Sequence, residues 1–194
     1  SWIRSWSKFA GNAWISSPKE AKQNTAGILI EQKYGDEDEW KRHFLYLLPF
    51  FQDERYIKKG NKPVFVIYIP SAIRNLKKMV DCWNRLAVEN GFDGVYFIGT
   101  NRGDWKRQKL DAELQYEPNY TMFREKNIHS ALGWQFKKLR EYCVSKNILF
   151  PEIFSYKKAL ALIAGRKRGK DVFPGCFVDF DSSPRKGNRA IIFM

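Results

Sequence analysis

Val64-Phe65-Val66-Ile67-Tyr68 is an unbroken apolar and aromatic run that stops just before Pro70. It closes a longer stretch, Gly27 to Pro70, in which a polar segment and an amphipathic helix come first. A strand that is apolar on both faces is typical of a parallel sheet, because helices cover both faces of such sheets. We therefore predict one helix–strand unit of a parallel α/β fold, with functional polar groups where the strand ends, near Tyr68.

The helix of this unit is predicted over 36–51. Asp36 can cap its first turn, Glu39 stands at the spacing of a capping box, and acidic residues crowd the positive end of the helix. Apolar residues recur on one face, namely Trp40, Phe44, Leu47, Leu48 and Phe51. These signals agree, so they predict an amphipathic helix that packs against the strand.

The alternation of helices and strands continues along the chain. Further helices are predicted at about 71–90, 131–146 and 155–164, and further strands at 94–99, 110–116 and 176–180. No glycine-rich phosphate loop follows any of these strands, which disfavours an open nucleotide-binding sheet. We therefore predict a TIM-like (β/α)8 barrel, present in part, as a single domain over 1–194.

Composition supports a folded chain. Its 194 residues are 44% hydrophobic and 16% aromatic, which excludes disorder as the main state. No run approaches the ~18 apolar residues of a membrane span. Three cysteines without a CxxC pair indicate a reducing compartment, so we expect a cytoplasmic protein. Both ends of the sequence are abrupt, and we expect the chain to be an internal fragment of a larger protein.

The chain carries a net charge of +13, from 34 basic and 21 acidic residues. Such an excess attracts polyanions, so a polyanion-binding module without catalysis is the alternative function, with nucleic acid or an acidic polysaccharide as its ligand. The one dense basic run is Arg166-Lys167-Arg168-Gly169-Lys170. We interpret it as a solvated loop whose cations stabilise the end of a helix, and we do not expect nucleic acid as a partner.

Residues 1–26 are predicted to form an irregular, aromatic loop. Loops of this length in compact domains are uncommon unless they line a site. Trp2 and Trp6 are candidate substrate-binding residues here, because an indole face matches the apolar C–H face of a sugar ring. The alternative is that these aromatic side chains plug the end of a hydrophobic core.

Several motifs resemble those of the WbsX family, whose members are described as lipopolysaccharide-type glycosyltransferases and belong among glycoside hydrolase family 99-like domains. The resemblance rests on the segments 28–35 and 62–68, and on Trp40, His43-Phe44, Leu47-Leu48-Pro49-Phe50-Phe51, Asp53-Glu54-Arg55-Tyr56-Ile57, Pro174-Gly175, Asp181, Pro184 and Arg185. At Phe180 and Ser182 the family usually has Trp and Asn. It implies a TIM-like barrel that acts on carbohydrate, commonly in the biosynthesis of bacterial surface polysaccharide. The family pattern also includes acidic motifs beyond both ends of this sequence, so we expect the isolated chain to be inactive.

Two carboxyl groups normally make or break a glycosidic bond, one protonated and one ionised. Asp181 and Asp179 are the candidate catalytic residues, on one face of the predicted last strand, and Arg185 is close enough in sequence to keep one of them ionised. An Asp–Arg pair that fixes the loop is the structural alternative. Asp179-Phe180-Asp181 also has the DxD pattern of metal-dependent sugar-nucleotide transferases, but the pattern is short, and we predict no metal and no cofactor.

The remaining candidates for binding sugar hydroxyls are Tyr68, Glu31, Glu113 and Tyr116, each of which could equally be a packed residue with a satisfied polar tip. His43 and His129 lack the spacing of metal ligands and are interpreted as packing or surface residues. The sequence thus predicts an oligosaccharide or polysaccharide substrate. The parent protein is expected to be a glycosyltransferase or an endo-acting glycoside hydrolase that acts at the carboxyl face of the barrel.

Overall fold

The computed structural model describes residues 33–100, 105–106, 108–124, 139, 142–143, 146, 148, 151–186 and 190–194, and the short strands at 6–7 and 28–30. For 6–7, 28–30, 123–124 and 185–186 it describes the backbone alone. The contacts divide the chain into two compact units. The first unit contains the described residues of 33–115 and 168–174, and the second contains those of 4–32, 116–167 and 175–194.

The first unit is a mixed α/β structure built on a five-stranded sheet of described residues, with strand order β3-β4-β5-β6-β8. The strands are β3 (Lys58–Lys59), β4 (Lys62–Ile67), β5 (Tyr96–Thr100), β6 (Ala112–Leu114) and β8 (Val172–Phe173). The last four strands run parallel, and β3 joins β4 as an antiparallel hairpin at the edge. The predicted parallel α/β arrangement is confirmed for this part of the chain.

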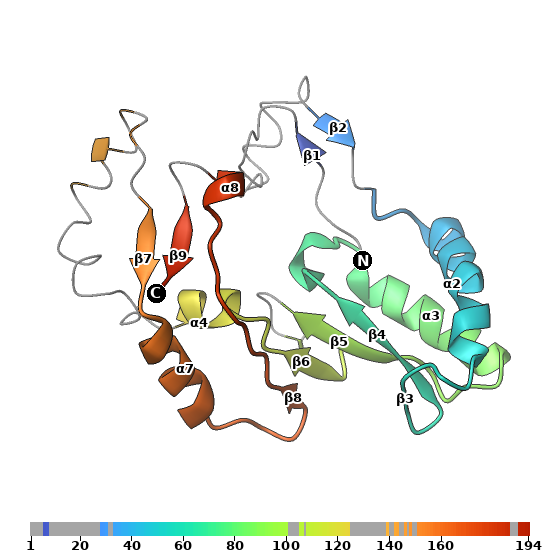
Figure 1. Ribbon diagram of the computed structural model, residues 1–194. Helices are drawn as coiled ribbons and strands as arrows, with labels where there is room; N and C mark the ends of the chain where they lie inside the picture. Colours follow the sequence, from blue (N-terminus) through green and yellow to red (C-terminus); the bar gives the residue numbers. More distant parts are fainter. Residues whose placement is uncertain are drawn as a thin grey trace. The chain divides into compact units, whose positions relative to one another are not determined.

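Two helices belong to this unit, α2 (Glu37–Gln52) and α3 (Leu76–Glu89), and Figure 1 shows them next to each other, beside β4 and β5. The prediction for α2 is confirmed within one residue at each end. Asp36 caps the helix, because its carboxylate accepts a hydrogen bond of 3.2 Å from the backbone N–H of Glu39. Trp40, Phe44 and Phe51 are buried, as the spacing predicted.

β4, the strand from which the parallel fold was predicted, differs in one respect from its prediction. β4 pairs with β5 in register, from Val64 opposite Tyr96 to Ile67 opposite Gly99. All five residues of β5 are buried, as expected for a strand covered on both faces. In β4, however, Val66 is 42% exposed. The helices cover one face of β4, whereas the other face carries only a smaller apolar cluster.

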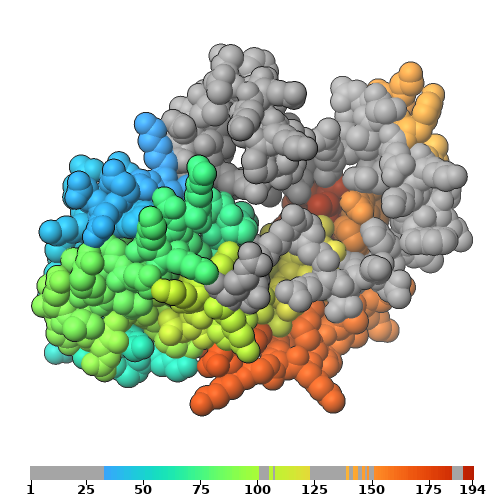
Figure 2. All heavy atoms as spheres, turned by 180° about the vertical axis from the view of Figure 1, so that it is seen from behind, coloured from blue at the N-terminus to red at the C-terminus, as the bar shows by residue number. Residues whose placement is uncertain are grey.

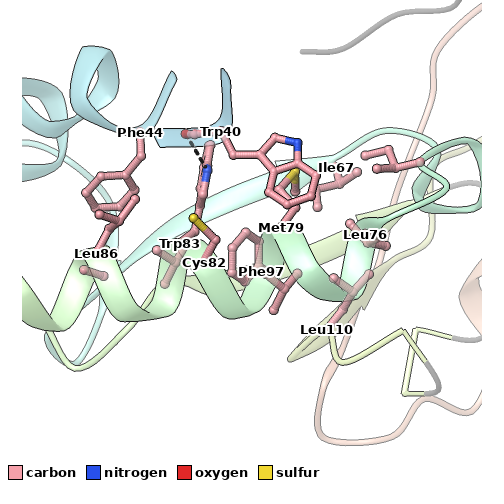
Figure 3. Packing of buried hydrophobic residues seen from close by; sticks show 14 of the residues in the cluster. Trp40, Phe44, Ile67, Leu76, Met79, Cys82, Trp83, Leu86, Phe97 and Leu110 are labelled. Atoms are coloured by element: carbon pink, nitrogen blue, oxygen red, sulfur yellow. Dashed lines mark hydrogen bonds between the residues drawn. The ribbon is translucent and has the colours of Figure 1, made fainter. Parts of the chain in front are cut away.

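The main core of the first unit lies between the helices and the sheet. Figure 3 shows Trp83, Met79 and Leu86 of α3 close to Phe44 of α2 and Phe97 of β5. The Trp83 ring is fully buried, and its centroid lies 4.8 to 6.5 Å from those of four phenylalanine rings, Phe44, Phe51, Phe65 and Phe97. Its Nε1 donates a 3.0 Å hydrogen bond to the carbonyl oxygen of Trp40, which ties the two helices together.

The start of the second predicted helix was wrong by several residues. Pro70–Ala72 forms a single 3-10 turn, and α3 begins only at Leu76. Pro70 fits the first position of a helix, which made the sequence resemble a helix start there. The predicted end is confirmed, because Gly91 has a φ of +86° and Phe92 N–H donates to the carbonyl oxygen of Ala87.

We predict that Gly99→Ala destabilises the first unit. An added Cβ would lie 2.6 Å from Leu110 Cδ1, closer than Cβ atoms approach other atoms, and a tight 3.1 Å from Pro70 Cγ. Overpacking of this kind costs about 1–3 kcal/mol, measurable by urea unfolding. Leu110→Ala in the same chain should recover part of the loss. If the two changes simply add, the contact with Leu110 is not the cause.

The second unit contains shorter elements: β1 (Trp6–Ser7), β2 (Ile28–Ile30), α4 (Asn119–Arg124), β7 (Glu152–Phe154), α7 (Tyr156–Gly165), α8 (Ser183–Lys186) and β9 (Ile191–Phe193). β7 runs parallel to β9, and the rings of Phe154 and Phe193 stack with centroids 5.1 Å apart. The helix predicted at 155–164 is confirmed as α7, whose first turn is capped by Ser155. Most of the helix predicted at 131–146 lies outside the described residues.

The strand predicted at 176–180 is wrong. This segment forms no strand, Asp179 has a φ of +24°, and Val178 is 82% exposed. In a strand, Phe177 and Phe180 would point to opposite faces of the sheet. Here the rings of both pack edge-on against the ring of Phe193. The alternation that would have put Asp179 and Asp181 on one face therefore does not apply.

Candidate functional site

The first unit has a depression of about 610 Å³ at the carboxyl ends of neighbouring parallel strands. One wall is the connection after β4, and the other is the connection between β5 and β6. Its lining residues are Ile73, Arg74, Asn75, Leu76, Lys77, Lys78 and Gln108. In parallel α/β folds, binding sites are built from the loops at this edge of the sheet, which makes this depression the candidate site of the first unit.

The ends of β4 and β5 are tied together at this edge. The hydroxyl of Thr100 donates a 2.7 Å hydrogen bond to the carbonyl oxygen of Tyr68. Thr100 is buried and Tyr68 is half-buried. The Tyr68 carbonyl oxygen, one residue beyond the end of β4, thereby accepts a hydrogen bond.

Two of the predicted substrate-binding residues, Glu113 and Tyr116, belong to different units. Glu113 lies in β6 of the first unit, opposite Gly99, so it shares the sheet face of Phe97 and not that of Thr100 and Leu114. Tyr116 belongs to the second unit and is exposed. Its carbonyl oxygen accepts the N–H of Tyr120 at the start of α4.

Asp181 and Asp179 are both exposed residues of the second unit. The carboxylate of Asp181 accepts hydrogen bonds from the backbone N–H and the hydroxyl of Ser183, the first residue of α8. These bonds hold the pKa of Asp181 below its ordinary value of 3.8. The cause is thus Ser183, whereas the sequence suggested Arg185, whose side chain lies outside the described residues.

Three other predicted positions also lie outside the described side chains. Glu31 and Trp2 are not described, and for Trp6 only the backbone is described, in β1, which pairs with β2. Their roles stay predictions. The same holds for most of the predicted loop at 1–26 and for His129.

The second unit contains a buried ion pair that the sequence did not reveal. Arg166 Nη1 lies 2.8 Å from Glu117 Oε1, and the two side chains are 12% and 0% exposed. The other oxygen of Glu117 accepts the N–H of Thr121, and Arg166 Nη2 donates to the hydroxyl of Thr121. The guanidinium also lies over the ring of Tyr120, 4.7 Å from its centroid. Both oxygens of Glu117 are engaged, so this carboxylate has a structural role.

The basic run at 166–170 is therefore only partly the solvated loop that was predicted. Arg166 forms the buried ion pair with Glu117. Arg168 is half-buried, and its Nε donates a 3.0 Å hydrogen bond to the side-chain oxygen of buried Gln115. Lys167 and Lys170 are exposed. Half of the charge of this run is thus used within the fold.

His43 packs in the first unit as a core-side residue. Its ring contacts Trp83 edge-on, with ring centroids 5.2 Å apart, and it borders a small cavity of about 10 Å³. Burial lowers the pKa of His43 below its ordinary value of 6.5. This environment agrees with the packing interpretation.

A pH dependence of stability follows from His43. Because its pKa is lower in the folded chain, the unfolded chain binds the proton more readily, and stability is lost as the pH falls below 6.5. We expect the free energy of unfolding to decrease between about pH 7 and pH 5. His43→Gln should flatten this part of the curve, measured by urea unfolding, whereas His129→Gln should preserve it. The reverse result would assign the effect to the other histidine.

Among the described residues, no group of three or more His, Cys, Asp or Glu side chains could hold a metal ion. In the same part of the chain, no helix has both the length and the apolar character needed to span a membrane.

The fold and the depression define the chain as a mixed α/β protein with parallel strands and a candidate site at their carboxyl edge. The chain belongs to the WbsX glycosyltransferase family, whose model matches residues 2–194. The resemblance noted in the sequence is thereby confirmed, and the family implies a carbohydrate substrate. A comparison with curated proteins gave no match, and neither did a comparison with solved structures.

Proposed function

We propose that the chain is part of a (β/α)8-type barrel from an enzyme that transfers or hydrolyses glycosyl groups in bacterial surface polysaccharide of the lipopolysaccharide or O-antigen type. The family match over residues 2–194 carries this proposal. The parallel order β4-β5-β6-β8 supports the barrel, because β4, α3 and β5 form the repeating unit of such folds. The depression after β4 supports a substrate site at the carboxyl ends of the strands.

Of the two candidate catalytic carboxylates, Asp181 is the one whose pKa is held low by its hydrogen bonds. Its lowered pKa keeps it ionised, which suits a nucleophile, a general base or an acceptor for a sugar hydroxyl. A general acid must carry a proton, so Asp181 does not fill that role. Asp179 stays the second candidate carboxylate, and Arg185, Tyr68 and Tyr116 stay candidates for holding sugar hydroxyls.

The role of Asp181 can be separated from its contact with Ser183. We expect Asp181→Asn to abolish the thermal stabilisation that an O-antigen oligosaccharide gives, since the amide accepts fewer hydrogen bonds from sugar hydroxyls. Ser183→Ala is the matched control, because it removes the hydroxyl donor but keeps the carboxylate. If both variants still bind the oligosaccharide, Asp181 serves only to begin α8.

The effect of added salt on binding distinguishes a sugar-binding site from the alternative function, a polyanion-binding module, which the net charge of +13 favours. Oligosaccharide binding that survives added salt supports the proposal. Binding to heparin or DNA that collapses as salt rises, without any oligosaccharide binding, supports the alternative. Manganese-dependent binding of a uridine-diphosphate sugar, lost in Asp179→Ala and Asp181→Ala, would select transfer over hydrolysis.

A further inference from the structure

The face of α2 that points away from the core is apolar along its middle. Leu45, Tyr46 and Phe50 are 45%, 69% and 52% exposed, and Pro49 is exposed as well. The rings of Tyr46 and Phe50 lie one helical turn apart, with centroids 6.0 Å from each other, so the four residues form one continuous patch, the α2 patch. The outer face of a surface helix is normally polar, and a contiguous exposed apolar patch marks an interaction surface.

The α2 patch is not used in the packing of the first unit. Trp40, Phe44 and Phe51 are the buried residues of α2, and they pack into the core from the opposite side of the helix. Figure 2 shows the blue atoms of α2 at the surface of the molecule. The patch is therefore an apolar surface that remains open after the helix has packed against α3 and the sheet.

Charged residues flank the α2 patch in a regular order of sign. Glu39 and Arg42 stand before it, Glu54 and Arg55 stand after it, and all four are exposed. Arg42 lies 3.7 Å from Glu39, and Arg55 lies 2.7 Å from Asp53, but the two arginine side chains are still 75% and 90% exposed. The order along the chain is thus negative, positive, patch, negative, positive.

This order of charges matches a second copy of the same helix in the antiparallel orientation. Arg42 and Glu54 lie at similar distances along the chain from the patch, so each meets the other when two patches are in contact. Glu39 then comes near Arg55 of the second copy, and unlike charges meet at both ends. In a parallel alignment, like charges would meet. An anionic membrane fits less well, because the carboxylates of Glu39 and Glu54 would repel it.

We propose that α2 forms a dimer interface, in which the α2 patch of one copy packs antiparallel against the α2 patch of a second copy about a two-fold axis. Interfaces that bury less than about 1,200 Å² in total are weak, and a single pair of helices belongs to this class. We therefore expect a reversible dimer with a dissociation constant on the order of 10–100 µM. This inference goes beyond the proposed function and does not depend on the ligand.

Sedimentation velocity of the full chain at rising concentration tests the interface, and we expect a shift from monomer to dimer. Tyr46→Glu/Phe50→Glu should weaken dimerisation by about tenfold or more, because it places unpaired carboxylates in the middle of the contact. Val88→Glu is the matched control, because Val88 is a 61% exposed apolar residue of α3 that lies outside the α2 patch. It should change the dissociation constant by less than about twofold.

Charge reversal tests the antiparallel order. Arg42→Glu and Glu54→Arg should each weaken the dimer, whereas Arg42→Glu/Glu54→Arg in one chain should restore it, because unlike charges then meet again. A chain that stays monomeric at about 200 µM overturns the proposal. Equal losses in Tyr46→Glu/Phe50→Glu and Val88→Glu, or no restoration by the double reversal, also overturn it. A monomer that instead binds phosphatidylglycerol vesicles through Tyr46 and Phe50 assigns the patch to a membrane and overturns it as well.

Discussion

Trp83→Ala should lower the free energy of unfolding by about 3–5 kcal/mol, as expected when a buried aromatic side chain is truncated. The Trp83 side chain is completely buried between α2, α3 and the sheet, and it touches four phenylalanine rings. Its loss opens a cavity and also removes the hydrogen bond to the Trp40 carbonyl oxygen, which Figure 3 shows as a dashed line. Urea unfolding followed by circular dichroism measures the change.

Tyr46→Ala is the control for Trp83→Ala, because Tyr46 is an aromatic residue of α2 that is 69% exposed. It should change stability by less than about 0.5 kcal/mol. Trp83→Phe should fall between the two variants, since it keeps most of the ring packing and loses the hydrogen bond. A loss in Trp83→Ala no larger than that in Tyr46→Ala would contradict the packing of this core.

The elements that the sequence predicted well are those whose signals are local. α2 combines a cap, acidic residues in the first turn and an apolar face within sixteen residues. β5 contains the apolar run that lies between Gly94 and Gly99, and all five of its residues are buried. Patterns of this kind are decided by neighbours along the chain, so no knowledge of distant contacts is needed.

The elements that were mispredicted depend on contacts that are distant along the chain. Phe177 and Phe180 read as part of a strand, but both turn toward Phe193, and Asp179 leaves the extended conformation. β8 is only two residues long and exists because it pairs with β6. Periodicity cannot identify a strand of that length.

The sequence predicted a site where the strands end, but none of the predicted site residues lines the depression. Polar groups at strand ends were predicted, and Tyr68 lies at the end of β4. The sequence analysis singled out no role for Arg74, Lys77 and Lys78, which line the depression. Glu117 and Arg166 are 49 residues apart, and no spacing rule links them.

Glu117→Ala should destabilise the second unit by about 3–5 kcal/mol, because it leaves the buried guanidinium of Arg166 without its charge partner. It also removes the acceptor for the Thr121 N–H, so a second buried group loses its hydrogen bond. Asp81→Asn is the control. It breaks the exposed pair with Lys109, whose nitrogen lies 2.9 Å from the carboxylate, and should cost about 0–1 kcal/mol.

The double variant Glu117→Leu/Arg166→Met separates the attraction within the pair from the penalty of breaking it. When both charges are removed, no buried charge is left unpaired, and the apolar side chains can fill much of the same space. We therefore expect the double variant to be more stable than Glu117→Leu alone, approaching the original chain. If instead the double variant loses the sum of the two single changes, the ion pair is not coupled, and the buried network around Thr121 does not hold α7 against the start of α4.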